Sequence, residues 1–308
     1  MSNSPAEPLR TAAAEPLVTP EWLANRLRKP DPDAPDPLIL DIRSVVDGGG
    51  RQAYEAAHIP AAIYTDYAND GWRVTKGMAS GLLPEPAALV ALFSRIGLTP
   101  RRHAIIVSAG TTVGDFSAAA RVYWTLKIAG HDSTSILSGG MLAWGRDATR
   151  PLEAGAPPVN PPSPPYPVKL APALRADVGA VQRAIADRTA VLLDSRATTF
   201  FQGSAKSPQA LRPGRLPGAV QLDHVAAFDS TAMALRSKAE LEQLFAAVTS
   251  TPVINYCNTG HQAATNWFVL SEVLGRPGIS LYDGSMSEWT QEPDRPVTVG
   301  PFEPASRS

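Results

Sequence analysis

Cys257 is the only cysteine of the chain, and its place in the sequence makes it the first candidate for covalent chemistry. It follows an apolar run at 252–256 and precedes a short loop with one glycine and then a helix-forming stretch. A thiol at a turn from strand to helix faces the N–H groups of the loop and the positive end of the helix dipole, which both favour the thiolate. The position therefore predicts a nucleophile. The alternative, a small buried hydrophobe, would suit the middle of an element better than a turn.

A single cysteine also restricts the chemistry. An internal disulfide, a Cys-x-x-Cys redox pair and a thiolate metal cluster are excluded, and no part of the chain indicates a cofactor or a metal. A cysteine phosphatase would need an arginine six residues after the nucleophile to hold the phosphate, and that position is Ala263. The loop can stabilise a thiolate, a persulfide or a small anion, but it is poorly equipped for phosphoryl transfer.

Composition limits the partners and the compartment. The formal net charge is −1, which argues against nucleic acid, and no apolar run approaches the length of a membrane span, so no membrane partner is expected. Residues 1–16 are polar and rich in alanine and proline, and we interpret them as a flexible leader. A free thiol without disulfides suits the cytoplasm. The periplasm stays open if a signal sequence was removed.

The elements that must position Cys257 occur twice in the chain. Each half contains a short apolar run ending in Asp-x-Arg, a turn with Ile-Pro or Leu-Pro, a second apolar strand before a loop and helix, and a closing segment that ends in tryptophan. The matched pairs are 41–43 with 194–196, 57–62 with 214–219, 104–108 with 252–256, and 136–144 with 281–289. Four landmarks in the same order predict two copies of one domain.

Alternating buried strands and amphipathic helices predict an α/β fold, with a mostly parallel sheet flanked by helices in each copy. The helical spacing is clearest at Leu89, Leu92, Phe93 and Ile96, and at Leu241, Leu244, Phe245 and Val248. Ligand sites of such sheets lie beyond the carboxyl ends of the strands, where Cys257 stands. The first copy has no thiol there. The position equivalent to Cys257 falls near Ala109, in a loop over 108–115 that we expect to be longer than the cysteine loop.

A proline-rich segment separates the copies. Eight of the 30 prolines lie between 151 and 167, which indicates an extended, semi-rigid linker. The predicted division is a leader at 1–16, a non-catalytic domain at 17–150, a linker at 151–168, a catalytic domain at 169–300 and a tail at 301–308.

Together these motifs resemble the tandem rhodanese family of two-domain sulfurtransferases, over roughly residues 17 to 300. The resemblance implies an inactive first domain and a catalytic second one. It also implies a cysteine that takes a sulfane sulfur from thiosulfate or 3-mercaptopyruvate, becomes a persulfide, and passes the sulfur to cyanide or a thiol. A sulfur-accepting protein stays open as a further partner.

Carried over by position, the resemblance makes Cys257 the nucleophile. It gives the backbone N–H groups of five residues the task of holding the sulfur: Asn258, Thr259, Gly260, His261 and Gln262. Asp194 and Arg196 take the Asp-x-Arg positions, which tie the strand end to the loop, and Arg196 is a candidate substrate-binding residue. The departures concern charge. The second and third loop positions are neutral, and Phe200 stands where the family usually has a substrate-binding arginine, so the donor stays open.

Other residues have two interpretations each. His261 could polarise a donor or pair with Cys257, or it could point into solvent. Arg212, Arg215 and Lys206 could restore the missing charge, but we expect solvated loop charges. Phe200 and Phe201 could line a donor pocket or pack in the core, and the core is favoured. Structural roles are expected for Trp267, Trp289, His58, Asp41 and Arg43.

Three functions remain. The first is sulfur transfer from a small donor through Cys257. The second is a persulfide carrier that a partner enzyme loads, which the neutral loop and Phe200 would suit. The third is a cysteine phosphatase or arsenate reductase, which Ala263 disfavours.

Overall fold

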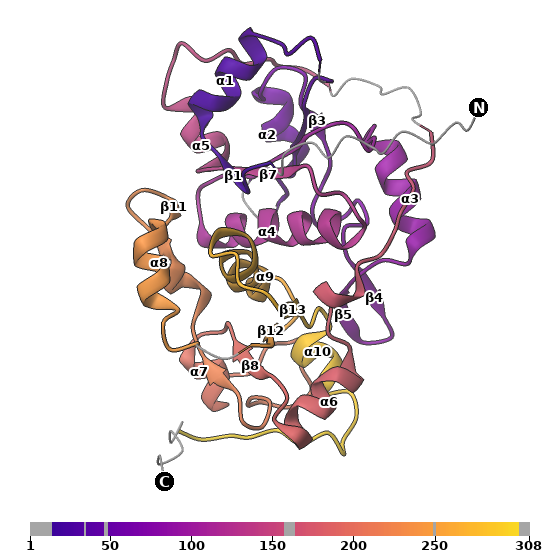
Figure 1. Cartoon of the computed structure of the whole chain (residues 1–308), viewed down its shortest axis with the longest axis vertical. Coiled ribbons are helices and arrows are strands. Elements are labelled where there is room, and N and C mark those ends of the chain that lie inside the picture. The colour runs from indigo at the N-terminus through magenta and orange to yellow at the C-terminus, as the bar shows by residue number, and fades with distance from the viewer. Residues whose placement is uncertain (1–13, 34, 46–48, 157–163, 249–250, 302–308) are drawn as a thin grey trace, which may run out of the picture.

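The computed structural model describes residues 14–33, 35–45, 49–156, 164–248 and 251–301. Two lobes lie one above the other along the long axis, each built on its own sheet (Figure 1). Most of the leader expected at 1–16 and of the tail at 301–308 lies outside the described residues. The end of that leader already belongs to the first sheet region, because the Pro16 carbonyl accepts a hydrogen bond from the Ile136 N–H at 2.9 Å.

The first sheet has five parallel strands in the order β1-β7-β6-β2-β3. Their bounds are β1 Leu17–Val18, β2 Leu38–Asp41, β3 Ile63–Tyr64, β6 Ala104–Val107 and β7 Thr134–Leu137. β2, β6 and β7 are buried at every position, which explains their apolar composition. A separate antiparallel hairpin is formed by β4 Val74–Lys76 and β5 Ala79–Leu82.

Helices cover this sheet. They are α1 Pro20–Arg28, α2 Gly50–Ala56, α3 Pro86–Arg95, α4 Val113–Ile128 and α5 Gly140–Gly145. α3 carries the predicted apolar face, since Leu89, Leu92 and Phe93 are buried. α4 is buried almost all round, and Thr112 and Asp115 begin it with a capping box.

The second sheet repeats the first. Its parallel strands run in the order β13-β12-β8-β9, with bounds β8 Val191–Asp194, β9 Val220–Gln221, β12 Val253–Tyr256 and β13 Ile279–Leu281. A single parallel bridge between Arg175 and Leu281 stands where β1 pairs with β7 in the first half. The order matches strand for strand, so the predicted repeat and α/β class are confirmed.

The remaining elements of the second half surround this sheet. They are α6 Val178–Asp187, α7 Thr198–Gln202, α8 Lys238–Leu244, α9 Gln262–Phe268, a π-helical turn Val269–Val273 and α10 Ser285–Trp289, with 3₁₀ turns at Pro172–Leu174 and His224–Ala227 and a hairpin of β10 Phe228–Asp229 with β11 Ala234–Leu235. α8 ends at Leu244, before the predicted positions Phe245 and Val248, although both side chains are buried.

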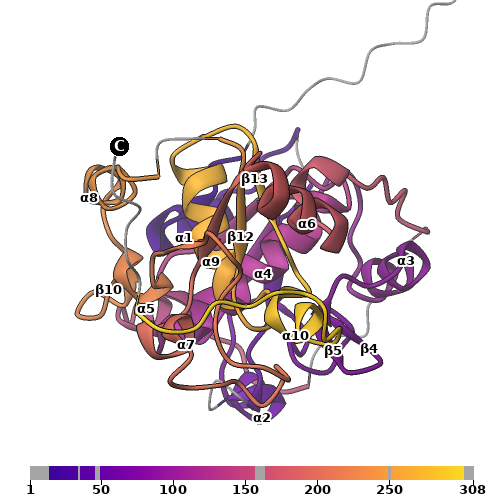
Figure 2. The ribbon, with the colours of Figure 1, turned by 90° about the horizontal axis from the view of Figure 1, so that it is seen from below.

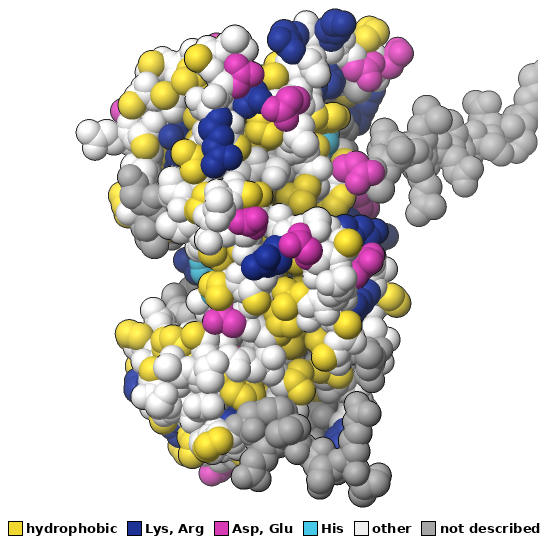
Figure 3. Space-filling model, turned by 90° about the vertical axis from the view of Figure 1, so that its left-hand side faces the viewer, with side chains coloured by type: hydrophobic (Ala, Val, Ile, Leu, Met, Phe, Trp, Pro, Cys, Tyr) yellow, Lys and Arg dark blue, Asp and Glu magenta, His cyan; other side chains and the backbone are white. Residues whose placement is uncertain are grey.

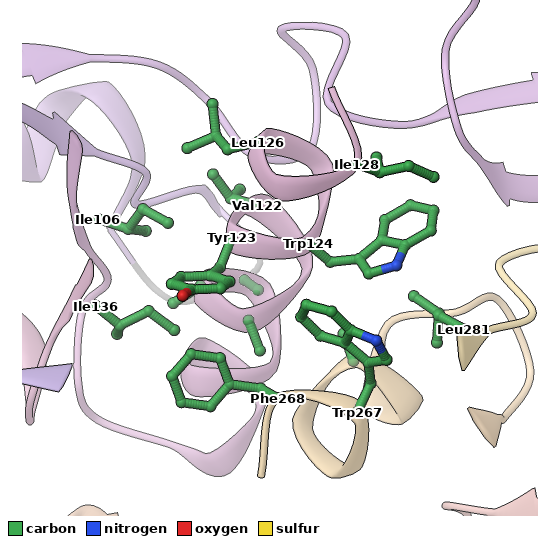
Figure 4. Close-up of a cluster of buried hydrophobic side chains, with 14 of the residues drawn as sticks. Ile106, Val122, Tyr123, Trp124, Leu126, Ile128, Ile136, Trp267, Phe268 and Leu281 are labelled. Carbon is green, nitrogen blue, oxygen red and sulfur yellow. The ribbon is translucent and has the colours of Figure 1, made fainter. Parts of the chain in front are cut away.

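α4 and α9 lie side by side between the two sheets (Figures 1 and 2). Large rings from both helices meet there: Figure 4 shows Tyr123 and Trp124 of α4 facing Trp267 and Phe268 of α9. The Tyr123 and Phe268 rings are edge to face with centroids 4.9 Å apart. Each such side chain contributes about 1.5–3 kcal/mol by leaving water. One continuous core therefore joins the two domains.

The linker expected at 151–168 is docked at both described ends. Glu153 pairs with His58 in an antiparallel bridge. Tyr166 is buried, contacts the Phe93 ring edge to face, and its hydroxyl lies 3.0 Å from His131 Nδ1. The segment therefore runs against the first domain as well as connecting the two. Residues 157–163 lie outside the described part.

On the face shown in Figure 3, basic and acidic side chains are interspersed, as a net charge of −1 suggests. None of the helices in the described part is both long and apolar enough to span a bilayer.

Candidate active site

Cys257 directly follows β12, at the carboxyl edge of the second sheet, and begins a five-residue loop that leads into α9. This is the edge at which the sequence predicts the site. The side chain is only 1% exposed, however, and belongs to the core that joins the domains. From the sequence alone, burial and reactivity are alternative interpretations of Cys257. In the structure the residue is buried and also lies at the reactive position, because the first domain covers the loop.

Ser285, at the start of α10, holds the loop from behind. Its hydroxyl accepts hydrogen bonds from the N–H groups of Cys257 at 3.0 Å and Gly260 at 3.1 Å, and donates to the Tyr282 carbonyl at 2.8 Å. Ser285 has a φ of +48°, a left-handed conformation that costs a non-glycine residue about 1–2 kcal/mol. This backbone strain occurs at a position where the Ser285 hydroxyl fixes the backbone of Cys257.

The other N–H groups of the loop remain available. Gly260 has a φ of +68°, and a Cβ there would lie 2.6 Å from the Asp283 carbonyl, so the tight turn requires glycine. Within the described part of the chain, the N–H groups of Asn258, Thr259 and His261 donate to no protein acceptor. The first N–H groups of any helix also lack intrahelical partners. Together they form a small set of donors beside Cys257 that suits an anionic sulfur.

Arg196 connects the loop to the neighbouring strand. Its guanidinium forms a 2.5 Å ion pair with Asp194, donates to the Gly214 carbonyl at 2.9 Å, and reaches Asn258 Oδ1 at 3.3 Å. Burial opposes its charge, but the hydrogen bonds and charge of Asp194 outweigh burial and raise the pKa of Arg196. The tying role expected for this pair agrees with these contacts. Much of the guanidinium is already engaged, which leaves little of it for a substrate.

His261 is half-buried and points toward the other domain. Its Nδ1 lies 2.8 Å from the hydroxyl of Tyr67, between β3 and β4. Burial, followed by the positive charges of Arg73 and Arg121, lowers the pKa of His261 to about 3. The imidazole is therefore neutral at physiological pH, and an ion pair between imidazolium and thiolate is disfavoured. The solvent-facing alternative is also wrong, because the ring is hydrogen-bonded across the domain boundary.

The β4–β5 hairpin of the first domain packs on the cysteine loop, and Figure 1 shows it beside α10. Ser80 and Ser287 exchange hydrogen bonds, with the Ser287 hydroxyl donating to the Ser80 carbonyl at 2.9 Å and accepting from the Ser80 N–H at 3.2 Å. A Cβ at Gly81 would lie 2.0 Å from the Thr259 carbonyl, so only glycine allows this approach. The domain without a thiol therefore forms one wall of the site.

Two of the three basic candidates on the 206–215 connection are engaged elsewhere. Arg212 donates to the carbonyls of Glu292, Pro293 and Arg295. Arg215 is 6% exposed and donates to the carbonyls of Phe201, Gly300 and Pro301. The prediction that these are solvated loop charges is wrong: both arginines fasten the C-terminal segment. Lys206 donates to the Ala210 carbonyl at 2.7 Å.

The expectation that both phenylalanines pack in the core holds for Phe201 but not for Phe200. Phe201 is buried in the core of the second domain, with Arg215 stacked on its ring at 4.5 Å, and Phe200 is half-buried. Trp267 and Trp289 are core aromatics, each 0–1% exposed, and both indole N–H groups donate to backbone carbonyls.

The landmarks of the first domain are structural, as expected. His58 stacks on Tyr54, and its Nδ1 lies 2.8 Å from the Tyr54 carbonyl. Arg43 pairs with Asp41 at 2.7 Å and donates to the Ala57 carbonyl at 2.8 Å, which repeats the contacts of Arg196.

The counterpart loop of the first domain differs from our prediction. The Met141 N–H donates to the Ser108 carbonyl as the Met286 N–H donates to that of Cys257, so Ser108, not Ala109, occupies the equivalent position. α4 begins at Val113, five residues later, and α9 begins five residues after Cys257. The loop is therefore not longer than the catalytic one. The loop predicted at 108–115 includes the first turn of α4, because the residues that cap this helix, Thr112 and Asp115, are also typical of loops.

Sequence reasoning missed Ser285 and Tyr67. Ser285 lies in a quoted landmark and aligns with Gly140, a glycine-to-serine difference that could have marked it. Tyr67 has no local signal, because only the tertiary contact brings it to the loop. Among the described residues, no three His, Cys, Asp or Glu side chains are grouped so that they could hold a metal ion.

Comparison with known proteins gives a consistent result. The rhodanese-like domain model matches residues 19–147 and again 177–292. The thiosulfate sulfurtransferase of Pseudomonas aeruginosa is 31% identical over 286 residues, which cover 92% of this chain and 97% of that protein. The 3-mercaptopyruvate sulfurtransferase of Escherichia coli K12 is 28% identical, with 91% and 97% covered.

Solved structures agree on the fold. The crystal structure of YnjE superimposes with a TM-score of 0.79 at 25% identity, covering 93% of this chain and 69% of that one. The anaerobic ergothioneine biosynthesis enzyme from Chlorobium limicola gives 0.78 at 20% identity, covering 93% and 71%. With two matched domains, a repeated sheet order and relatives of the same length, this chain belongs to the rhodanese-like family as a tandem-domain member.

Proposed function

We propose that this protein is a sulfurtransferase that moves a sulfane sulfur from a small anionic donor through a persulfide on Cys257. The position of Cys257 carries the proposal: the thiol lies at the carboxyl edge of a parallel sheet, beside loop N–H groups without protein acceptors. The names of the relatives, thiosulfate and 3-mercaptopyruvate sulfurtransferases, support the same reaction class.

In the first half-reaction, the Cys257 thiolate attacks the sulfane sulfur of the donor. A bond forms between the two sulfurs, the bond from that sulfur to the rest of the donor breaks, and the leaving group departs with the electron pair. This group is sulfite from thiosulfate, or the enolate of pyruvate, which then takes up a proton, from 3-mercaptopyruvate. In the second half, cyanide or a thiolate attacks the outer sulfur, and the Cys257 thiolate leaves.

The loop contributes by holding the negative charge before and after each transfer. N–H groups of Asn258, Thr259, His261 and Gln262 are the proposed donors, while Ser285 keeps the N–H of Gly260 aimed away from the sulfur. Such preorganised donors lose little energy to reorientation during the reaction. Burial by the first domain removes competing water from the same charge.

We also propose that the two domains divide the work as expected, with 17–150 non-catalytic and 169–300 catalytic. The described part of the first domain contains no thiol. It nevertheless supplies the hairpin and Tyr67 that complete the site.

The test is intact-protein mass after incubation with thiosulfate, with 3-mercaptopyruvate and with no donor, followed by cyanide. We expect one added sulfur on the wild-type chain that cyanide removes, and none on Cys257→Ser, because a hydroxyl is a poor sulfur nucleophile at neutral pH. Circular dichroism of the variant checks its fold. Sulfur loading of Cys257→Ser would disprove the mechanism, and loading only by a partner enzyme would favour a carrier.

A further inference from the structure

The proposed donors are anions, yet the loop has no available cation of its own. Asn258 and Thr259 are neutral, and His261 is uncharged at physiological pH. Arg196 is paired with Asp194. The arginines of the 206–215 connection are bound to backbone carbonyls of the C-terminal segment. Positive charge for a donor must therefore come from another part of the molecule.

The first domain presents such charge directly opposite the loop. Arg73 immediately precedes β4, in the hairpin that packs on Thr259. Its guanidinium lies over the Tyr67 ring, 4.5 Å from the centroid, and the Tyr67 hydroxyl is hydrogen-bonded to His261 of the loop. A cation–π contact and a hydrogen bond thus connect Arg73, Tyr67 and His261 from one domain to the other.

Arg73 has no protein anion to balance its charge. None of the ion pairs among the described residues contains Arg73, and its buried Nε atom has no hydrogen-bond partner. The side chain is half-buried, so part of it faces solvent at the domain boundary. A partly desolvated guanidinium without an anionic partner is unfavourable by itself, and an anion that binds it would offset that cost.

A second cation reinforces this one. Arg121 of α4 is fully buried, stacks on Trp124 at 4.3 Å, and donates to the Gly81 carbonyl beneath the hairpin. Burial lowers its pKa to about 10, which still leaves it charged at neutral pH. Asp283, whose negative charge acts on Arg121, is already engaged with Arg175 at 2.8 Å and the Leu83 N–H at 2.6 Å.

We infer that Arg73 of the non-catalytic domain binds the anionic oxygens of the sulfur donor and presents its sulfane sulfur to Cys257. A guanidinium offers two parallel N–H groups that match a carboxylate or a sulfonate, which is the chemistry shared by 3-mercaptopyruvate and thiosulfate. The inference rests on the proposed function and deepens it. It assigns donor recognition to the domain that lacks the thiol.

The test separates binding from chemistry by using Cys257→Ser protein and titration calorimetry with thiosulfate and with 3-mercaptopyruvate. Arg73→Ala should weaken donor binding about tenfold or more, as expected for a lost charged hydrogen bond. Arg73→Lys should retain part of the affinity, because it keeps the charge but loses the fork. The matched control is Arg51→Ala, which removes an exposed arginine stacked on another tyrosine of the same domain, Tyr64.

A second measurement uses the native thiol. The rate at which uncharged iodoacetamide alkylates Cys257 should be the same in Arg73→Ala as in the wild type, within about twofold. An equal loss of alkylation and of donor binding would overturn the inference, because Arg73 would then act on the loop or the thiol.

Unchanged affinity of Arg73→Ala for both donors would also overturn it. A loss confined to thiosulfate would support sulfonate recognition, and a loss confined to 3-mercaptopyruvate would support carboxylate recognition. If both anions bind Cys257→Ser normally but neither loads the wild-type thiol, the proposed function fails while the binding role of Arg73 stands.

Discussion

The loops that follow β6 and β12 share one frame and differ in what fills it. Each has five residues between strand and helix, and each receives an N–H from the segment after the last strand, Met141 in one and Met286 in the other. In the first domain, the Asp115 carboxylate accepts from the Thr111 N–H at 2.6 Å and the Thr112 N–H at 2.9 Å.

The second domain has Ala264 at the position of Asp115. Thr111 and Thr112 correspond to Gly260 and His261 of the second loop. Without that carboxylate, the N–H of His261 is left for an external anion, while the N–H of Gly260 donates to Ser285. Two changes within the loop and its helix distinguish the scaffold copy from the reactive one. A thiol replaces the serine hydroxyl, and an internal anion is removed so that a sulfur anion can take its place.

The largest effect is expected when the second loop receives the carboxylate of the first. Ala264→Asp should cap the loop and repel both the thiolate and the donor, and we expect sulfur loading to slow on the order of 100-fold, like the loss of an oxyanion donor. Stopped-time intact-mass measurements give the loading rate. Ala264→Asn, which is similar in size but uncharged, is the matched control.

Near-normal loading of Ala264→Asp, in a protein whose thermal unfolding shows that it is folded, would contradict the interpretation. The distinction between the loops would then depend on the thiol alone.

The next difference is the left-handed residue before the last helix, Gly140 in the first domain at φ +57° and Ser285 in the second at +48°. Ser285→Gly relieves strain of about 1 kcal/mol but removes two accepted hydrogen bonds, so the free energy of unfolding should change by about 1 kcal/mol or less. Sulfur transfer should nevertheless fall about tenfold, because the cysteine backbone loses its fixed position. Urea unfolding and steady-state rates separate the two effects.

The reciprocal change serves as its control. In Gly140→Ser the new Cβ would meet the Ser108 carbonyl at 2.3 Å, so we expect a loss of about 2 kcal/mol in stability while loading of Cys257 in the folded protein is unaffected. Wild-type rates in Ser285→Gly would show that the hydroxyl is only structural.

Much of this arrangement was accessible from the sequence, because it depends on local patterns. Apolar strands, helical spacing and the repeated landmarks predicted two parallel sheets, and the position of Cys257 predicted the edge at which it lies. Contacts between the domains were not accessible. The burial of Cys257, the bond from Tyr67 to His261 and the position of Arg73 result from packing of one domain on the other, to which no spacing along the chain corresponds.

The arginines of the 206–215 connection illustrate the same limit. Arg212 and Arg215 stand in a stretch rich in glycine and proline, where a charged side chain is normally solvated. The C-terminal segment returns over them and offers its carbonyls, so both guanidinium groups are fixed. The contact that fixes Arg212 thus comes partly from Glu292, 80 positions further along the chain.

The smallest expected difference between the halves is their response to acid. Burial lowers the pKa of His131, which is 1% exposed, to about 4, and burial followed by His131 and Arg26 lowers that of His103 to about 4. Because these pKa values lie below the unfolded value of about 6.5, the unfolded chain binds more protons between those limits, and stability falls as the pH is lowered through that window. Both residues belong to the first domain. In the second domain, the lowered pKa of His261 also makes the stability fall as the pH is lowered.

At pH 5, the His131 contribution should be at most about 2 kcal/mol of lost stability relative to pH 7.5, and His131→Gln should reduce the pH dependence by that amount. Urea unfolding at the two pH values gives the change in the free energy of unfolding between them, for the wild type and for the variant. The difference between these two changes is the His131 contribution, because any pH-independent effect of the substitution cancels. A variant with the wild-type pH dependence would mean that His131 is protonated equally in both states. Burial of His131 would then not contribute to any loss of stability in acid.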